Sequence, residues 1–193
     1  MGIIERDVYV EMVRDNLEQI PIHRCPSGYS FRWFEPNDDE LWIGIWNASD
    51  KNLAIDQGTF ENEFGKDRDH LGTRQFFLVD AIGRAIGTST AWFAEDRNTE
   101  RRGRVHWIAV IPEMRGAGLS KPIMTTTCER LRELGYDSAM LGTSTARLSA
   151  INLYREFGFR PAIRNDEDSK IWQELSPYLR TPLDTSTTYD PDR

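Results

Sequence analysis

One stretch of fifteen residues constrains the fold more than any other part of the chain. It reads VIPEMRGAGLSKPIM, from Val110 to Met124, and places an apolar run, a proline, an arginine and two glycines ahead of a helical pattern. Pro112 cannot donate a hydrogen bond to a sheet, and glycine adopts backbone angles that other residues avoid. The stretch therefore predicts a strand that leaves its sheet, a glycine turn and a helix that begins near Leu119.

Length, charge and cysteine content narrow the class of protein. The chain has 193 residues, enough for one domain with a single core. Its net charge of −7 gives no expectation of a nucleic-acid partner, because phosphate backbones are bound by Lys and Arg. The run LWIGIWNA is too short to span a membrane, and the first residues lack a signal-peptide core, so we expect a cytoplasmic location and no membrane partner. The 2 cysteines and 3 histidines form no metal-binding pattern, so no metal is expected.

Hydrophobic spacing predicts a mixed set of strands and helices. Helices are expected at residues 3–20, 37–49, around Phe60 and Phe64, at 119–134 and at 150–157. Strands are expected at residues 29–34, 74–80, 84–94, 103–111 and 138–145, followed by a closing hairpin formed by FRPAI (159–163) and SKIWQEL (169–175).

The order of these elements indicates the fold class. Strands 74–80, 84–94 and 103–111 read as an antiparallel meander, and the strand at 138–145 follows a helix, which implies a parallel crossover. We predict an α+β domain: a mixed, mostly antiparallel central sheet of about seven strands with helices on both faces. The expected organisation is an N-terminal helical extension (1–27), the main domain (28–175) and a loosely held polar tail (176–193).

The glycine turn has two interpretations. A helix N-terminus presents unpaired amides and the positive end of the helix dipole, so RGAGLS is suited to hold a phosphate with Arg115 as a supporting cation. The same glycines also suit a plain turn between strand and helix. A P-loop is excluded because Leu119 and Ser120 follow Gly118, and a dinucleotide fingerprint is excluded because Lys121 stands where a third glycine is needed.

IAVIPEMRGAGLS resembles the acyl-CoA motif of the GNAT superfamily of N-acetyltransferases, whose pattern is Arg/Gln-x-x-Gly-x-Gly/Ala at a strand–helix junction. The pattern is filled by Arg115, Gly116, Ala117, Gly118, Leu119 and Ser120. The later segment LGTSTARLSAINLYREFGF is similar to the family segment that ends in Leu-Tyr-x-x-x-Gly-Phe, and the order of elements agrees from about Tyr29 to Leu175. The resemblance implies an acyl-CoA N-acyltransferase fold and acetyl-CoA as co-substrate.

The resemblance also implies roles for the backbone of this stretch. The backbone of Ile108 and Val110 would pair with the pantetheine arm like an added strand, in a gap opened by a bulge that we expect at VIP (110–112). The amides from Arg115 to Ser120 would bind the pyrophosphate. The Val110 amide would stabilise the oxyanion of the tetrahedral intermediate.

Two side chains receive roles on the same basis. Tyr154 would protonate the departing thiolate, although it also lies on the apolar stripe of Ala150, Leu153 and Phe157 and is suited to a core position. Relatives often carry Asn seven residues before this tyrosine, where Arg147 stands here. Arg147 would meet a phosphate of coenzyme A or lie in solvent.

The group that accepts the amine proton is left open. His106 is the best single candidate, because it lies on the strand that leads into the expected bulge; a hydrogen-bonded structural histidine is the alternative. Glu95, Asp96 and Glu113 are further candidates, each also suited to a surface position. Aromatic residues are expected either to line an acceptor pocket or to fill the core: Trp33, Trp42, Trp46, Phe60 and Phe64.

Three functions follow from these patterns. The first is an N-acetyltransferase that moves an acetyl group from acetyl-CoA to a primary amine by direct attack in a ternary complex. The second is a non-catalytic acyl-CoA-binding or regulatory module, and the third is a protein-interaction domain whose glycines only turn the chain. The expected partner is a small-molecule or peptide amine, and a homodimer is compatible with the N-terminal segment.

Overall fold

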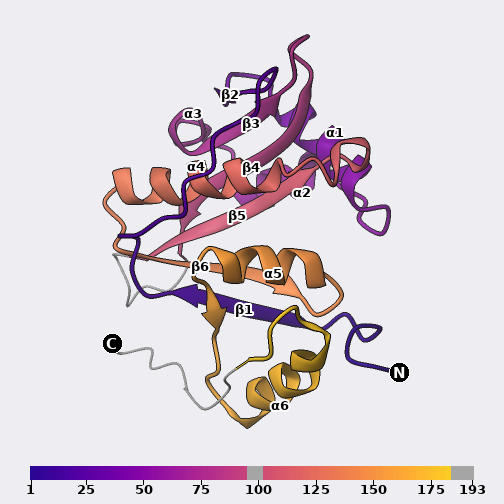
Figure 1. Ribbon diagram of the computed structural model, residues 1–193. Helices are drawn as coiled ribbons and strands as arrows, with labels where there is room; N and C mark the ends of the chain where they lie inside the picture. Colours follow the sequence, from indigo (N-terminus) through magenta and orange to yellow (C-terminus); the bar gives the residue numbers. More distant parts are fainter. Residues whose placement is uncertain (95–101, 184–193) are drawn as a thin grey trace.

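The computed structural model describes residues 1–94 and 102–183, and its centre is one open sheet (Figure 1). The strands are β1 Tyr9–Arg14, β2 Ser30–Trp33, β3 Gln75–Val79, β4 Ala85–Phe93, β5 Arg102–Val110, β6 Ser138–Ser144 and β7 Arg160–Pro161. They form a 7-stranded sheet in the order β2-β3-β4-β5-β6-β1-β7. Every pairing is antiparallel except that of β5 with β6, which confirms the predicted mixed, mostly antiparallel sheet.

Helices cover the sheet. The α-helices are α1 Asp39–Ser49, α2 Gln57–Phe64, α3 Leu71–Arg74, α4 Ser120–Glu133, α5 Leu148–Glu156 and α6 Asp166–Leu175, with short 3-10 turns at Pro112–Met114 and Ser176–Tyr178. Figure 1 shows α4 on one face of the β3–β5 region and α1 and α2 on the other. Each helix in the described part of the chain is too short or too polar to cross a lipid bilayer.

Local sequence accounts for where these helices begin and end. The Asp56 side chain accepts a hydrogen bond from the Thr59 amide and caps α2, which ends at Gly65 with φ 78°. Gly135 follows α4 and Gly158 follows α5, both with positive φ, as in helix ends that turn through the left-handed region. The predicted helices at 37–49, 119–134 and 150–157 are confirmed with small changes of boundary.

The hydrophobic core divides into two clusters, one on each half of the sheet. One contains the aromatic side chains of α1 and α2 packed on β3 and β4, with Trp42, Phe60 and Phe76 fully buried. The other joins β1 and β6 to α4, α5 and α6. Figure 1 shows β5 and β6 diverging between these halves. Two cores on one sheet allow it to open in the middle without loss of the apolar packing on either side.

The predicted helix at residues 3–20 is wrong, because residues 9–14 form β1 inside the sheet. β1 pairs antiparallel with β6 along its whole length and with β7 on its other edge. The predicted helix used Ile4, Val8 and Met12, which are four residues apart. Four is also a multiple of the strand period of two, so the same residues share one face of a strand. The helical extension 1–27 is therefore corrected to a segment with a central strand.

The predicted closing hairpin is also wrong. Residues 166–175 form α6, in which the Asn165 side chain accepts from the Asp168 amide at 2.9 Å and three acidic residues occupy the first turn. These are helix-start signals that the strand interpretation overlooked. β7 has only 2 residues and pairs with β1. The sheet therefore has 7 strands because β1 is one of them, and residues 169–175 do not contribute a strand.

The segment after Leu175 is held more firmly than expected as far as residue 183. Leu179 is buried in the core, and its neighbour Arg180 donates its amide to Asn152 at 3.0 Å. Arg155 contacts the carbonyl of Thr181. The expectation of a loose tail is therefore wrong for residues 176–183, and residues 184–193 lie outside the described part of the chain.

Candidate functional site

The sheet opens where β5 parts from β6. Among the described residues, the two strands pair through Arg102–Ser138, Gly103–Ala139 and Arg104–Met140 and no further. Just beyond, Thr88 pairs with Ala109 and Thr90 with His106, so β5 carries one extra residue in a bulge at Trp107 and Ile108. The predicted bulge at VIP is wrong by several residues, because Pro112 lies past the end of β5 and begins a 3-10 turn.

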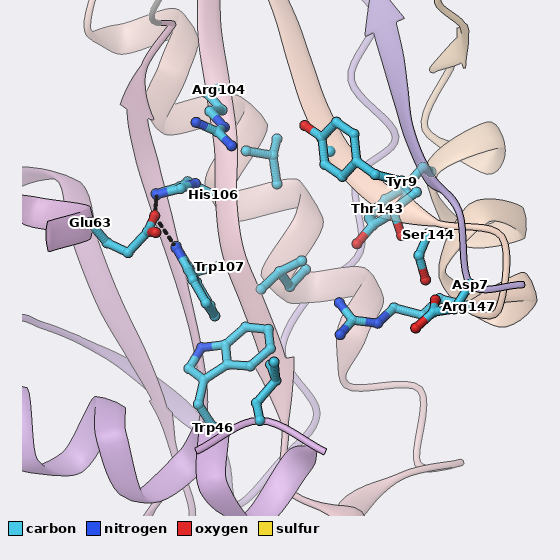
Figure 2. Close-up of a pocket in the computed structure, with 15 residues that line it drawn as sticks. Asp7, Tyr9, Trp46, Glu63, Arg104, His106, Trp107, Thr143, Ser144 and Arg147 are labelled. Carbon is cyan, nitrogen blue, oxygen red and sulfur yellow. Dashed lines mark hydrogen bonds and ion pairs between the residues drawn. The ribbon is translucent and has the colours of Figure 1, made fainter. Parts of the chain in front are cut away.

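A cavity of about 330 Å³ lies in this opening (Figure 2). Both halves of the sheet, together with α1, α2 and α5, contribute to its lining. Figure 2 shows Glu63, His106 and Trp107 at one side and Tyr9 and Arg147 at the other. The cavity therefore joins segments that are far apart in the sequence.

The end of β5 presents its backbone to the opening. Ile108 lines the cavity. The Ile111 amide donates to the Ile86 carbonyl of β4 at 2.9 Å. Backbone amides of consecutive residues in a strand point in opposite directions. The Val110 amide therefore faces away from β4, towards the opening. The hydroxyl of Ser49, the last residue of α1, donates to the Val110 carbonyl at 3.2 Å. The Val110 amide is thus placed beside the opening, with its carbonyl already partnered.

The glycine loop has the conformation that the sequence predicts. Gly116 and Gly118 have φ values of 79° and 74°, which side-chain-bearing residues rarely adopt. The Arg115 amide donates to the Pro112 carbonyl at 3.1 Å, so it is already engaged, in contrast to the prediction. Among the described residues, none accepts a hydrogen bond from the next five amides, 116–120. A run of unengaged donors therefore precedes α4, a helix of 14 residues.

The arginines on both sides of the opening contact the C-terminal end of α1. Arg115 Nη2 donates to the Ser49 carbonyl at 2.5 Å, and Arg147 Nη2 donates to the Asp50 carboxylate at 2.8 Å. Arg147 also lines the cavity, so it is neither fully in solvent nor unpaired. The end of α1 is thereby linked to the glycine loop and to α5.

Tyr154 lies in α5 with 5% of its surface exposed, and it lines the cavity while its ring packs in the core. Both sequence interpretations of this residue are thus compatible with its position. Burial raises the pKa of the phenol to about 12, and the nearby Arg147 guanidinium opposes the shift. The hydroxyl has no hydrogen-bond partner within residues 1–94 and 102–183, and it stays protonated at neutral pH.

His106 is buried and belongs to a polar cluster with two neighbours. Its Nε2 lies 3.1 Å from Oε2 of Glu63, and the Trp107 indole Nε1 donates to the same oxygen at 2.7 Å. The His106 hydrogen bond is the main cause that lowers the pKa of Glu63, and burial opposes it. His106 therefore makes the structural contact that one interpretation predicts, and it also lines the cavity, as the catalytic interpretation requires.

Glu63, Asp7 and Tyr9 are cavity residues that the sequence analysis missed. Glu63 is one of two acidic residues in α2, with no motif to distinguish it from Glu61. Asp7 and Tyr9 fall in the predicted helix 3–20, outside the main domain. Glu113 is exposed in the 3-10 turn and does not line the cavity. Glu95 and Asp96 lie outside the described residues.

Most of the aromatic residues expected at an acceptor pocket belong to the core. Trp42, Phe60 and Phe64 are buried in the cluster on β3 and β4. Trp33 lies on the edge strand β2 with 40% exposure and does not reach the cavity. Only Trp46 of the five lines it, together with Trp107. The described residues contain no group of three or more His, Cys, Asp or Glu side chains arranged to hold a metal ion.

Comparison with known protein families and sequences gives a consistent picture. A model of the acetyltransferase (GNAT) family matches residues 26–159, more than half of the chain. A mycothiol acetyltransferase from Thermobispora bispora is 31% identical over 146 residues, which cover 72% of this chain and 49% of the relative. N-acetyltransferase 8B from Homo sapiens is 31% identical over 86 residues, covering 44% of this chain and 38% of that protein. The matched part of the chain spans about half the length of the curated mycothiol acetyltransferases.

Solved structures agree in fold. A GCN5-related N-acetyltransferase from Sphaerobacter thermophilus has a TM-score of 0.65 at 18% identity and covers 79% of this chain and 48% of its own. The ribosomal-protein-S18-alanine N-acetyltransferase from Escherichia coli has a TM-score of 0.57 at 19% identity. That alignment covers 72% of this chain and 83% of the solved chain. At these identities the likeness concerns the fold, and it confirms the predicted acyl-CoA N-acyltransferase-like architecture.

Proposed function

The chain belongs to the acetyltransferase (GNAT) family, whose members are acyl-CoA-dependent N-acyltransferases, and we propose that it transfers an acetyl group from acetyl-CoA to a primary amine by direct attack in a ternary complex. The observation that carries this proposal is the run of five unengaged amides, 116–120, beside the opening between β5 and β6. These donors and the start of α4 are suited to a pyrophosphate. The adjacent opening is suited to the pantetheine arm, which would pair with Ile108 and Val110.

Arginines supplement these amides. Arg115 is proposed to exchange the neutral Ser49 carbonyl for a phosphate oxygen, which is a stronger partner because it is charged. Arg147 is proposed to exchange the Asp50 carboxylate for a phosphate oxygen, so that one charged partner replaces another. Pro122 in the first turn of α4 lacks an amide, so the donors are concentrated in the loop ahead of it. Residues 115–120 and Arg147 together form the proposed coenzyme site.

The proposed reaction forms one amide bond, breaks one thioester bond and releases one proton. The ammonium group of the acceptor loses one proton, and its nitrogen attacks the thioester carbonyl. The Val110 amide stabilises the oxyanion, and the C–S bond breaks as the nitrogen loses a second proton. The thiolate takes a proton from Tyr154, which recovers one from the nitrogen through solvent. The products are an amide, coenzyme A and one released proton, and His106 is the proposed residue for the first proton transfer.

Direct attack is favoured over an acyl-enzyme because the chain offers no suitable thiolate. Cys128 is fully buried in α4, and burial raises its pKa to about 12. Burial also raises the pKa of Cys25. A thiol must ionise to carry an acyl group, so both cysteines are poor nucleophiles at neutral pH.

The decisive test measures coenzyme binding and turnover together. Saturating coenzyme A should raise the thermal unfolding midpoint, since a ligand at a hundred times its Kd stabilises by about 2.7 kcal/mol. A panel of amines, amino acids and peptides should then release coenzyme A from acetyl-CoA. A shift without release by any amine would indicate the non-catalytic binding module, and no shift would indicate the interaction domain. Because the match covers 49% and 45% of two of the mycothiol acetyltransferases, their acceptor is not assigned to this chain.

A further inference from the structure

The cavity contains a carboxylate that the proposed reaction does not use. Glu63 is in the last turn of α2, and its side chain lines the cavity with 34% exposure. His106 and Trp107 both contact one of its oxygens, Oε2 (Figure 2). No hydrogen bond or ion pair within the described part of the chain reaches the other oxygen, Oε1. The carboxylate is thus held by one oxygen and offers the second.

The bulge in β5 creates this arrangement. Consecutive side chains of a regular strand point to opposite faces of the sheet. His106 and Trp107 are consecutive, yet both reach the same oxygen of Glu63. Trp107 has φ 51°, a left-handed conformation that costs about 1–3 kcal/mol in a residue of this kind. The surrounding structure holds this strain, and the result is two donors directed at one carboxylate.

The contacts of Glu63 keep it negatively charged. The His106 hydrogen bond lowers its pKa most, the Trp107 indole and the Arg104 guanidinium lower it further, and burial opposes them. Trp46 and Trp107 also line the cavity, and their rings lie 4.6 Å apart in an edge-to-face contact. A fixed anion beside aromatic rings favours a ligand that carries a cation on an apolar, flat body.

From this geometry we propose that Glu63 binds the ammonium group of the acceptor, and that the acceptor is an arylalkyl primary amine whose ring packs against Trp46 and Trp107. This assignment rests on the proposed acetyl transfer at the same cavity. Acetylation converts the ammonium into a neutral amide, so the ion pair with Glu63 is lost as the product forms. Glu63 therefore distinguishes the substrate from the product and favours release of the product.

A purely structural role for Glu63, in which it only fastens α2 to β5, makes a different prediction. If Glu63 has only that role, the cavity should bind a cation and a neutral molecule of the same shape with equal affinity. Phenethylamine and 2-phenylethanol form such a pair, because an ammonium group in one replaces a hydroxyl group in the other. Their affinities for the full chain saturated with coenzyme A are measured by isothermal titration calorimetry at pH 7.

The wild type should bind phenethylamine at least ten times more tightly than 2-phenylethanol. Glu63→Gln should bind both equally, because it keeps the size of the side chain and removes the charge. Glu61→Gln is the matched control: Glu61 lies in the same helix with 33% exposure, pairs with Lys66 and Arg68, and does not line the cavity. It should retain the full preference. Glu63→Asp, which keeps the charge, should retain most of it.

Three results would overturn the inference: no binding of phenethylamine to the wild type, equal binding of the two compounds, or an unchanged preference in Glu63→Gln. Glu63→Ala repeats the charge removal in case the glutamine variant does not fold. Release of coenzyme A separates this inference from the proposed function. Turnover of other amines without binding of phenethylamine contradicts the inference alone. A Glu63-dependent preference without any coenzyme A release contradicts the acetyl transfer alone.

Discussion

The two ends of the cleft are built in different ways. The proposed coenzyme end is nearly continuous in sequence, because residues 108–120 supply the strand edge, the turn and the amides ahead of α4. The proposed acceptor end consists of side chains from separate elements: Trp46 of α1, Glu63 of α2 and Trp107 of β5. The direction of a main-chain amide is set by the local backbone angles, so a short motif is enough to predict it. A cluster of side chains from separate elements changes its chemistry with each substitution. The coenzyme can therefore be inferred from a short motif, and the acceptor only from the assembled fold.

The largest effect is expected at Tyr154, where the two ends meet. Tyr154→Phe should reduce kcat by about 100- to 1,000-fold, because the loss of a general acid typically costs two to four orders of magnitude. Stability and acetyl-CoA affinity should stay near wild type, since the hydroxyl makes no hydrogen bond within the described residues. Coenzyme A release and calorimetric titration measure the two properties. Turnover equal to wild type would remove Tyr154 from the chemistry.

The next largest effect is expected when the backbone conformation of the glycine loop is changed at the proposed coenzyme end. Gly118→Ala should raise the KM for acetyl-CoA about tenfold, because a left-handed residue with a side chain costs about 1–2 kcal/mol and the loop relieves this strain by rotating its amides away from the ligand.

Gly28→Ala is the control for this substitution, since Gly28 has φ 86°, open space around it and no place in the cavity lining. It should lose similar stability in urea unfolding and keep the wild-type KM. An unchanged KM in Gly118→Ala would contradict the assignment of the loop as the pyrophosphate site.

A smaller effect is expected where the two ends are linked through α1. Asp50→Asn releases Arg147 from its ion pair, so acetyl-CoA should bind about two to five times more tightly at low salt, in line with the modest strength of exposed ion pairs. The gain should disappear near about 0.5 M salt. Asp15→Asn, which breaks the exposed pair with Arg160, is the control and should change nothing. Weaker coenzyme binding in Asp50→Asn would show that Arg147 does not contact a phosphate.

The smallest effect concerns the contribution of Glu63 to stability. The folded protein lowers the pKa of Glu63 below its ordinary value of 4.5, so the stabilisation is complete above that pH and is lost as the pH falls through the lower folded value. Urea unfolding should show Glu63→Gln less stable than wild type at pH 6, by up to about 1 kcal/mol because the side chain is a third exposed. The difference should shrink as the pH falls below 4.5. A difference that grows with acidity would contradict the direction of the shift.

The N-terminal segment shows why part of this fold was not predictable from the sequence. Ile4, Val8 and Met12 satisfy the period of a helix and the face of a strand equally well. The choice between them depends on β6, more than a hundred residues away, which pairs with residues 9–14. The error at residues 166–175 was of another kind, because Asn165 and the acidic turn after it were readable as the start of α6.

The sequence alone determined the strand, turn and helix around residues 108–133 and the parallel crossover into β6, because these depend on backbone sterics and short-range periodicity. The family was indicated separately, by the resemblance of two motifs to known sequences. The tertiary structure alone decided that β1 lies between β6 and β7, that the bulge falls at Trp107 and Ile108, and that Glu63 contacts His106 at one side of the cavity. Strand order and side-chain convergence depend on burial shared between distant segments. Burial of this kind cannot be predicted from a short segment of the sequence, because it depends on residues in distant segments.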